Sequence, residues 1–429
     1  MKLAIIGTGY VGLTTGICLS DVGHTVVCVD NDKSKIRQLK NNEVPIYEPG
    51  LKELLLKNVK SRRLSFTTSI KEAVKKSDVI FISVGTPPRE DGSADLSYIE
   101  NVATDIAKNM DCYKLIVDKS TVPVETGEKV EITIKRNLRK NIPFDVASNP
   151  EFLREGSAVY DTLHPDRIVV GVSSKKAENI LKEIYRPLKA TVLVTDIKSA
   201  EIIKHASNSF LATKISFINA VANICERCGA NVEKVAEGMG LDKRIGRAFL
   251  NAGIGFGGFC FPKDLEAFLW ISKKLGYEFD LIKNVKEINE HQKKSFVKKV
   301  EDSLWILKGK TVGVLGLAFK PDTDDMRFAP SIDIIKALQK EGAKIKAYDP
   351  KAHKRAKSVL KNVTYCRDPY ETAKNADCLA ILTEWKEVKN INLAKIKKLL
   401  KHPIIIDGRN IFNPEEMKRL GFVYKSIGR

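Results

Sequence analysis

A glycine-rich segment that leads into a cysteine is the most unusual part of this sequence. Residues 253–264 read GIGFGGFCFPKD, so four glycines precede Cys260, and Lys263 and Asp264 follow it. Glycines let a backbone approach a ligand closely, and a nearby cation can favour the reactive thiolate. A buried structural cysteine, the commonest fate of this residue type, needs neither feature. Because no histidine or second cysteine stands at metal-ligand spacing, we expect Cys260 to be a covalent nucleophile and expect no metal site.

Two other segments carry polar groups that could assist a nucleophile. Lys204 and Asn208 are four residues apart in an apolar helical pattern, so they emerge on one helix face. Lysine is rarely buried without a partner, so Lys204 lies either at the helix rim or in a site. Residues 149–156, NPEFLREG, follow a predicted strand, and at a helix start Glu151 and Glu155 would share a face. Compensation of a helix dipole explains one of these carboxylates better than both.

The segment GTGYVG at residues 7–12 predicts a dinucleotide site. It directly follows the apolar run Leu3–Ile6, and Asp30 ends the next predicted strand. The glycines let the backbone approach a pyrophosphate at the positive end of a helix, and Asp30 can accept bonds from ribose hydroxyls. The Asp30 carboxylate would also repel the 2′-phosphate of NADP, so we expect NAD as the cofactor, although Lys35 lies nearby.

Three more segments lie where the strands of an open α/β sheet bind ligands. VGTPP at 84–88 and KSTVP at 119–123 follow predicted strands, and each is also explained as a strand-ending turn. GVLGLAFK at 313–320 lacks the third glycine of a dinucleotide loop and is followed by Asp324, Asp325 and Arg327. A nucleotide diphosphate therefore fits this later segment better than a second dinucleotide.

The elements that must position these groups predict an α/β fold in three parts. Residues 1–198 alternate strands and helices, residues 199–307 are helical, and residues 308–429 alternate again, which indicates two mostly parallel sheets. The predicted strands are Leu3–Ile6, Thr25–Val29, Val79–Val84, Leu115–Val117, Asp145–Ala147, Ile168–Val172, Val192–Val194, Thr311–Leu315, Lys344–Tyr348, Cys378–Leu382 and Ile404–Ile406.

One long helix is predicted over residues 199–226, where apolar residues recur at helical spacing without glycine or proline. It would be about 40 Å long at ~1.5 Å per residue. Its apolar residues are too many for one small helical domain to cover, so we expect a homodimer built on this helix.

Composition excludes several classes of protein. The chain has 429 residues, 43% of them hydrophobic and 29% charged, which is typical of a globular protein and not of a disordered or fibrous one. The net charge is +19, but lysines are scattered along every element, which indicates a solvated surface and not a nucleic-acid stripe. Eight dispersed cysteines indicate reduced thiols, and the lone pair Cys225 and Cys228 predicts no zinc site. Without a membrane span or signal segment, we expect a cytoplasmic protein.

Taken together, these segments resemble the UDP-glucose/GDP-mannose dehydrogenase family, and within it the UDP-glucose 6-dehydrogenases. The resemblance covers essentially the whole chain, in order: GTGYVG, Asp30, IYEPGL, VGTPP, STVP, NPEFLREG, Lys204 with Asn208, GFGGFCFPKD, GLAFKPDTDDMR and DGRN. It implies two Rossmann-like domains joined by a central helical domain, a dimer, and a twofold oxidation of a nucleotide sugar at C6 that uses two NAD.

The resemblance also implies roles for individual residues. The catalytic residues would be Cys260, Lys204, Asn208, Asp264, Thr121 and Glu151. NAD would be held by Gly7, Gly9, Tyr10, Val11, Gly12, Asp30, Lys35, Val84, Gly85, Thr86, Ser120, Thr121, Glu155, Lys263 and Arg327. The sugar nucleotide would be held by Glu151, Phe152, Leu153, Arg154, Glu155, Lys204, Asn208, Arg244, Asn251, Gly255, Phe256, Gly257, Phe319, Lys320 and Arg409. The two α/β domains would close over one sugar nucleotide.

The residue types suit this chemistry, and three interpretations remain open. A thiolate traps the intermediate aldehyde as a thiohemiacetal, and loss of a second hydride leaves a thioester that water cleaves. The first interpretation is oxidation of UDP-glucose, and the second is oxidation of a UDP-N-acetylhexosamine or GDP-mannose. Phe259 stands where many relatives carry a small residue and where N-acetyl sugar enzymes tend to carry histidine. The third is a non-catalytic basic nucleotide-binding protein, which would not need Cys260, Lys204, Asn208 and Asp264 together.

Overall fold

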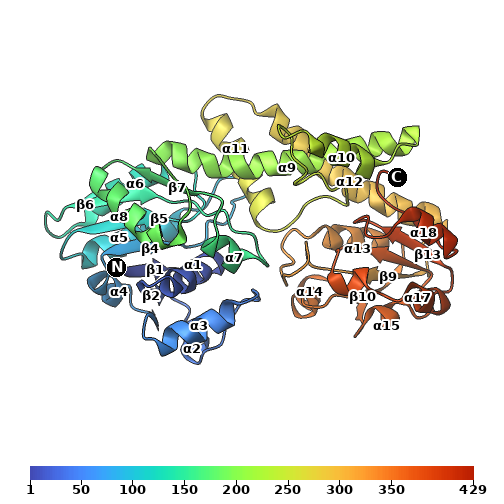
Figure 1. Cartoon of the computed structure of the whole chain (residues 1–429), viewed down its shortest axis with the longest axis horizontal. Helices are drawn as coiled ribbons and strands as arrows, with labels where there is room; N and C mark the ends of the chain where they lie inside the picture. Colours follow the sequence, from blue (N-terminus) through green and yellow to red (C-terminus); the bar gives the residue numbers. More distant parts are fainter. The chain divides into compact units, whose positions relative to one another are not determined.

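The computed structural model describes all 429 residues, which form two compact units. The first unit comprises Met1–Ser207 and Glu266–Tyr277, and the second comprises Asn208–Leu265 and Glu278–Arg429. Each unit contains one sheet with helices packed on it (Figure 1). The α/β class and the two largely parallel sheets predicted from the sequence are confirmed. No helix in the chain is long and apolar enough to cross a lipid bilayer.

The first sheet has eight strands in the order β3-β2-β1-β4-β5-β6-β7-β8. All neighbours are parallel except β6 and β7, which are antiparallel. In this register Ile6 pairs with Val29 and with Ile82, so the segments that carry Gly7, Asp30 and Val84 leave the sheet at one edge. The strands are β1 (Lys2–Ile6), β2 (Thr25–Val29), β3 (Leu64–Thr67), β4 (Val79–Ile82), β5 (Lys114–Asp118), β6 (Phe144–Ser148), β7 (Ile168–Val172) and β8 (Val192–Thr195).

Helices bury both faces of this sheet in separate clusters. On one face Leu13 and Ile17 of α1 pack with Leu51 of α3, and on the other Ile106 of α5 packs with Ile134 of α6. The helices are α1 (Tyr10–Asp21), α2 (Lys33–Lys40), α3 (Leu51–Lys60), α4 (Ile70–Lys76), α5 (Ser97–Asn109), α6 (Thr126–Asn137), α7 (Ala158–Leu163) and α8 (Lys175–Tyr185). Burial on both faces explains why β1, β4 and β5 read as continuous apolar runs.

The second unit holds a six-stranded parallel sheet in the order β11-β10-β9-β12-β13-β14. Its strands are β9 (Thr311–Leu315), β10 (Lys344–Tyr348), β11 (Val363–Tyr365), β12 (Cys378–Ile381), β13 (Ile404–Asp407) and β14 (Val423–Lys425). The helices that lie wholly within this unit are α10 (Val232–Leu241), α12 (Asp280–Leu304), α13 (Pro330–Lys340), α14 (His353–Val359), α15 (Pro369–Ala373), α16 (Lys386–Lys389), α17 (Leu393–Leu399) and α18 (Pro414–Arg419). Ile218 on the long helix and Phe296 on α12 belong to the same core as this sheet.

The predicted long helix is present as α9 (Ile197–Cys228), two residues longer at each end than expected. Its residues up to Ser207 belong to the first compact unit and those from Asn208 belong to the second. Several of its apolar side chains are exposed, among them Phe210 at 66%, Phe217 at 51% and Ile224 at 60%. Strands β3, β11 and β14 were not predicted, because each is a three- or four-residue strand with little local pattern.

Candidate active site

The glycine segment of the first unit is shaped as a dinucleotide loop. Gly7 has φ +103°, and a Cβ there would lie 2.4 Å from the Ser83 carbonyl oxygen. A Cβ at Gly12 would lie 2.0 Å from the Gly7 oxygen, so neither position accepts a side chain. A Cβ at Gly9 would meet nothing within 4 Å, which leaves open space at the start of α1. The amide groups of this helix start are suited to a pyrophosphate.

Asp30 is fixed beside this loop by hydrogen bonds. Its Oδ2 accepts bonds from the Thr8 amide at 2.9 Å and the Thr8 hydroxyl at 2.6 Å, and its Oδ1 accepts one from the Asp32 amide at 2.9 Å. The Lys35 ammonium lies 3.7 Å from Oδ2. Burial opposes ionisation of Asp30, but these donors and Lys35 outweigh it and lower the pKa. The carboxylate is therefore charged and oriented at the position that the sequence assigned to the ribose.

The two strand-ending segments lie together at the same sheet edge. The Thr86 hydroxyl donates to the Thr121 carbonyl at 2.9 Å, and the Ser120 hydroxyl donates to the Val84 carbonyl at 2.9 Å. These two hydrogen bonds join the segments that contain the predicted cofactor residues Val84, Gly85, Thr86, Ser120 and Thr121. The sheet register explains this, because β1, β4 and β5 are neighbours.

The NPEFLREG segment does not begin a helix, so the expected shared helix face of Glu151 and Glu155 is wrong. Residues 151–156 form an irregular loop, and α7 begins at Ala158. Glu151 turns back on this loop and accepts a hydrogen bond from the Leu153 amide at 2.6 Å. Its Oε1 lies 2.9 Å from the Lys204 ammonium, and the two side chains are 6% and 4% exposed. The lysine is thus buried in a site with a carboxylate partner.

In the second unit, Cys260 is the first residue of α11 (Cys260–Lys274). Asn208 donates its amide to Oδ2 of Asp264 at 2.5 Å, and the Lys263 ammonium lies 2.6 Å from Oδ1. Asp264 is 1% exposed and Lys263 8%. The hydrogen bond from Asn208 to Asp264 requires the amide nitrogen of Asn208 to face the carboxylate, and this nitrogen carries a second N–H. Four of the predicted residues therefore meet around one buried carboxylate and the start of α11.

The glycines before Cys260 are required by packing. A Cβ at Gly257 would lie 2.3 Å from the Phe328 carbonyl oxygen, and one at Gly258 would lie 2.7 Å from the Phe319 ring. The next residue, Phe259, faces two cations: the Arg327 guanidinium lies 4.4 Å and the Lys263 ammonium 5.8 Å from its ring centre. An aromatic ring at this position therefore orders charged groups beside the thiol.

Arg409 ties the predicted sugar-nucleotide residues of the second unit together. Its guanidinium donates to the carbonyl oxygens of Leu382 at 2.9 Å, Gly255 at 3.2 Å and Phe319 at 3.3 Å. The Lys320 ammonium lies 5.7 Å from the Phe319 ring centre. These residues converge at one edge of the six-stranded sheet, after β9, β12 and β13.

Three predicted sugar-nucleotide residues lie outside the clusters around Lys204, Asp264 and Arg409. The Arg244 side chain is 88% exposed and pairs with Asp242. The Arg154 side chain is 62% exposed and pairs with Asp161, and Asn251 is exposed. Their assignment therefore rests on the sequence motifs and not on the geometry of this structure.

All three segments of the chain match one protein family. The NAD binding domain of the UDP-glucose/GDP-mannose dehydrogenase family matches residues 1–189, its central domain matches 198–291 and its UDP binding domain matches 313–414. The chain belongs to this family. The family's NAD binding domain contains the glycine loop and Asp30, the central domain contains Lys204, Asn208 and Cys260, and the UDP binding domain contains Phe319, Lys320, Arg327 and Arg409.

Similar dehydrogenases cover the full length of this family member. The UDP-glucose 6-dehydrogenase TuaD of Bacillus subtilis is 54% identical over 429 residues, which is 100% of this chain and 93% of that protein. YwqF, a second UDP-glucose 6-dehydrogenase of Bacillus subtilis, is 48% identical and is covered to 98%. The solved UDP-glucose dehydrogenase of Pyrobaculum islandicum is 40% identical, with a TM-score of 0.93 over 99% of this chain and 96% of that one.

Lys119 is a candidate functional residue of this dehydrogenase that was not among the predicted site residues, although it begins the KSTVP segment. Its ammonium donates to the Asn149 carbonyl at 3.2 Å and to the Asn149 side-chain oxygen at 3.1 Å. Burial lowers the pKa of Lys119 to about 8, with Glu151 opposing the change and Lys204 adding to it. Lys119, Asn149 and Glu151 also line a cavity of about 170 Å³ beside the 151–154 loop. A lysine directly after the buried strand β5 was the available signal.

Proposed function

We propose that this protein is an NAD-dependent UDP-glucose 6-dehydrogenase. The family's NAD binding domain supports the cofactor, and the full-length relatives support the substrate. The observation that carries the proposal is the cluster of Asn208, Lys263 and Asp264 at the helix start that carries Cys260. We further propose that residues 1–198 hold NAD, 199–307 carry the nucleophile and 308–429 hold the UDP-sugar.

The net reaction oxidises the C6 alcohol to a carboxylate by two hydride transfers and the addition of one water. NAD, bound at the glycine loop, would accept one hydride in each oxidation. Between them the Cys260 sulfur adds to the C6 aldehyde to form a thiohemiacetal, which keeps the aldehyde from escaping. The second oxidation gives a thioester at Cys260, and water cleaves the carbon–sulfur bond to release the carboxylate and the thiol. Two NADH and three protons leave for each sugar.

The polar residues have distinct parts in this sequence. Lys204 and the second N–H of Asn208 are suitable donors to the oxyanion of the tetrahedral species. Glu151 has one oxygen on Lys204 and the other on the Leu153 amide, so it orients the lysine and positions water. Asp264 has both oxygens occupied and holds Asn208 and Lys263 in place. Thr121 lies in the segment that follows β5, and its carbonyl accepts a hydrogen bond from Thr86 beside the proposed cofactor site.

Stoichiometry with a panel of nucleotide sugars tests the function. We expect two NADH per UDP-glucose consumed, and much lower kcat/KM with UDP-N-acetylhexosamines and GDP-mannose. A preference for either of those sugars would replace the proposed substrate. No turnover with any of them, together with tight binding of a nucleotide or a salt-dependent gel shift, would favour a non-catalytic binding protein.

Substitution of Cys260 tests the covalent step. Cys260→Ala should bind NADH with wild-type affinity but form no uronic acid, because the aldehyde has no thiol to trap it. Cys260→Ser should form an ester that hydrolyses slowly, so mass spectrometry should find a sugar–enzyme adduct. Uronic acid production by Cys260→Ala near the wild-type rate would end the covalent mechanism.

We also propose that the active form is a homodimer built on α9. The exposed Phe210, Phe217 and Ile224 support a partner surface, because they recur every seven residues along one face of α9 and exposed apolar patches often mark protein interfaces. Light scattering at assay concentration should give twice the monomer mass. A fully active monomer would contradict this proposal.

A further inference from the structure

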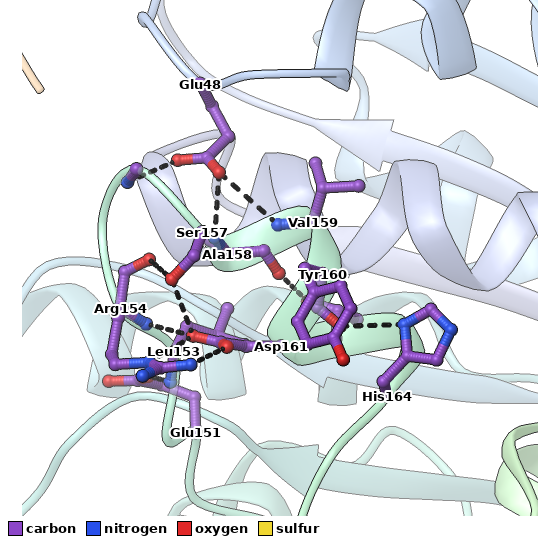
Figure 2. Close-up of polar contacts among 12 residues, drawn as sticks. Glu48, Glu151, Leu153, Arg154, Ser157, Ala158, Val159, Tyr160, Asp161 and His164 are labelled. Atoms are coloured by element: carbon purple, nitrogen blue, oxygen red, sulfur yellow. Dashed lines mark hydrogen bonds and ion pairs between the residues drawn. The ribbon is translucent and has the colours of Figure 1, made fainter. Parts of the chain in front are cut away.

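Glu48 lies at the centre of a polar cluster in the first unit (Figure 2). It belongs to the segment IYEPGL at residues 46–51, and its side chain is buried, with 7% of the residue exposed. Its Oε1 accepts hydrogen bonds from the Ala158 amide at 2.7 Å and the Val159 amide at 3.4 Å. These amides belong to the first turn of α7, so Glu48 caps a helix from a distant part of the chain.

The other oxygen of Glu48 reaches the two ligand-binding loops of this unit. Its Oε2 accepts a hydrogen bond from the Gly156 amide at 2.7 Å, at the end of the 151–156 loop. The same oxygen accepts a hydrogen bond from the Tyr10 hydroxyl. That hydroxyl in turn accepts a bond from the Gly156 amide at 2.9 Å. Tyr10 is the first residue of α1, directly after the glycine loop, so one carboxylate oxygen joins the cofactor loop to the sugar loop.

The position of Glu48 is itself fixed. Three residues later α3 begins at Leu51, which is fully buried in the core together with Leu13 of α1. The Glu48 carboxylate is therefore held close to α1, the helix that follows the glycine loop. A shift of Glu48 together with the 151–156 loop would disturb the packing of Leu51 in the core. A buried carboxylate with several donors is costly to leave partly satisfied, so its partners move together or not at all.

We propose that Glu48 is a positioning residue that couples the cofactor site to the sugar-nucleotide site through Tyr10 and Gly156. The inference rests on the proposed function, because it takes the glycine loop as the NAD site and the 151–156 loop as part of the sugar-nucleotide site. A dinucleotide that orders Tyr10 also orders the Gly156 amide, because Glu48 bonds both groups. A sugar nucleotide that orders the 151–156 loop orders Tyr10 through the same carboxylate. By linkage, each ligand then tightens the binding of the other by the same factor.

Binding of NADH and UDP-glucose to unreacted enzyme tests this coupling. NADH is the reduced product, so the complex with UDP-glucose does not turn over. In the wild type, saturating UDP-glucose should lower the Kd for NADH at least about fivefold, the lower end of typical couplings between sites. In Tyr10→Phe and in Glu48→Gln this ratio should fall to near one. The double variant should show no further loss, because both changes cut the same link.

Asp161→Asn is the matched control. The Asp161 carboxylate also holds the sugar loop, since it accepts hydrogen bonds from the Arg154 amide and side chain at 2.5–3.0 Å (Figure 2). No hydrogen bond joins Asp161 to Tyr10, whose hydroxyl bonds Glu48 and Gly156. This variant should weaken UDP-glucose binding and keep the ratio of NADH affinities. Tyr10→Phe retains the whole carboxylate and serves if Glu48→Gln does not fold.

Three results would overturn the inference. These are a wild-type ratio of one, a Tyr10→Phe protein with the wild-type ratio, and an Asp161→Asn protein that loses the ratio as fully as Glu48→Gln. Each is distinct from failure of the proposed function, which would appear as a wild-type protein that binds NADH but makes no NADH from UDP-glucose.

Discussion

Replacing Lys204 by methionine separates the structural and catalytic contributions of one buried ion pair. The Lys204 ammonium lies 2.9 Å from Glu151, and both side chains are almost fully buried. Removal of one partner from such a pair costs about 3–5 kcal/mol, because the other charge stays buried. The lower end applies here, since the Leu153 amide still donates to Glu151 at 2.6 Å. A loss of about 3 kcal/mol should lower the melting temperature of a unit of ~200 residues by roughly 6–12 °C.

The same substitution removes a donor assigned to the oxyanion. Loss of one such donor typically lowers kcat by about 10²–10³. The paired variant Lys204→Met/Glu151→Gln removes both charges and so leaves no uncompensated carboxylate. We expect it to recover most of the lost melting temperature while its kcat remains as low as that of Lys204→Met. Stability and activity would then depend on different properties of the same lysine.

Calorimetry and initial rates of NADH formation measure the two effects. The rates are taken at saturating UDP-glucose, and NADH binding confirms that the cofactor loop is intact in each variant. Wild-type kcat in Lys204→Met would refute the oxyanion assignment. A double variant as unstable as the single one would refute the argument from the ion pair.

Three further substitutions test the cofactor loop, the cysteine loop and a buried acid. Asp30→Ser should raise kcat/KM for NADP relative to NAD by about tenfold, ~1.4 kcal/mol, and an unchanged ratio would show that the carboxylate does not select the cofactor. Gly258→Ala should cost about 1–3 kcal/mol and lower kcat, because Gly258 has φ +81° and a Cβ would meet the Phe319 ring; wild-type melting and kcat would contradict this. Burial raises the pKa of Glu201 to about 7, against hydrogen bonds from the Gly127 and Glu125 amides. This group therefore adds stability below pH 4.5 that is lost as pH rises through 7, and Glu201→Gln should flatten the decline in melting temperature between those values.

The parts of the site that depend on local sequence could be predicted. The glycine loop and Asp30 could be located from a strand, a turn and a helix start that are adjacent in the chain, and the structure has this strand–turn–helix arrangement. Their binding of NAD stays a prediction. The placement of the Thr86 and Thr121 segments at the carboxyl ends of strands could be predicted, and ligands bind at that end of an open α/β sheet. The hydrogen bond between the two residues could not be predicted. Long helix α9 was predicted within two residues at each end because its apolar pattern is continuous.

The parts that depend on contacts between distant segments could not be predicted. The IYEPGL motif was noted, but nothing local places Glu48 against Gly156, which lies 108 positions away. Lys119 resembles any lysine after a strand until the fold buries it on Asn149. The helix expected at Glu151 failed because its carboxylate bonds the Leu153 amide and Lys204, which favours a loop.

The charge beside Cys260 also differs in origin from what the sequence suggested. Lys263 was expected to favour the thiolate, but its ammonium lies 2.6 Å from Asp264, so the two buried charges largely offset each other. The feature that favours the thiolate is then the N-terminus of α11, where Cys260 is the first residue. Neutralising Asp264 would release the Lys263 charge toward the thiol and free the Asn208 amide to turn. The harm from losing Asp264 should therefore fall on the oxyanion donor and on thioester cleavage, and not on the nucleophilicity of the sulfur.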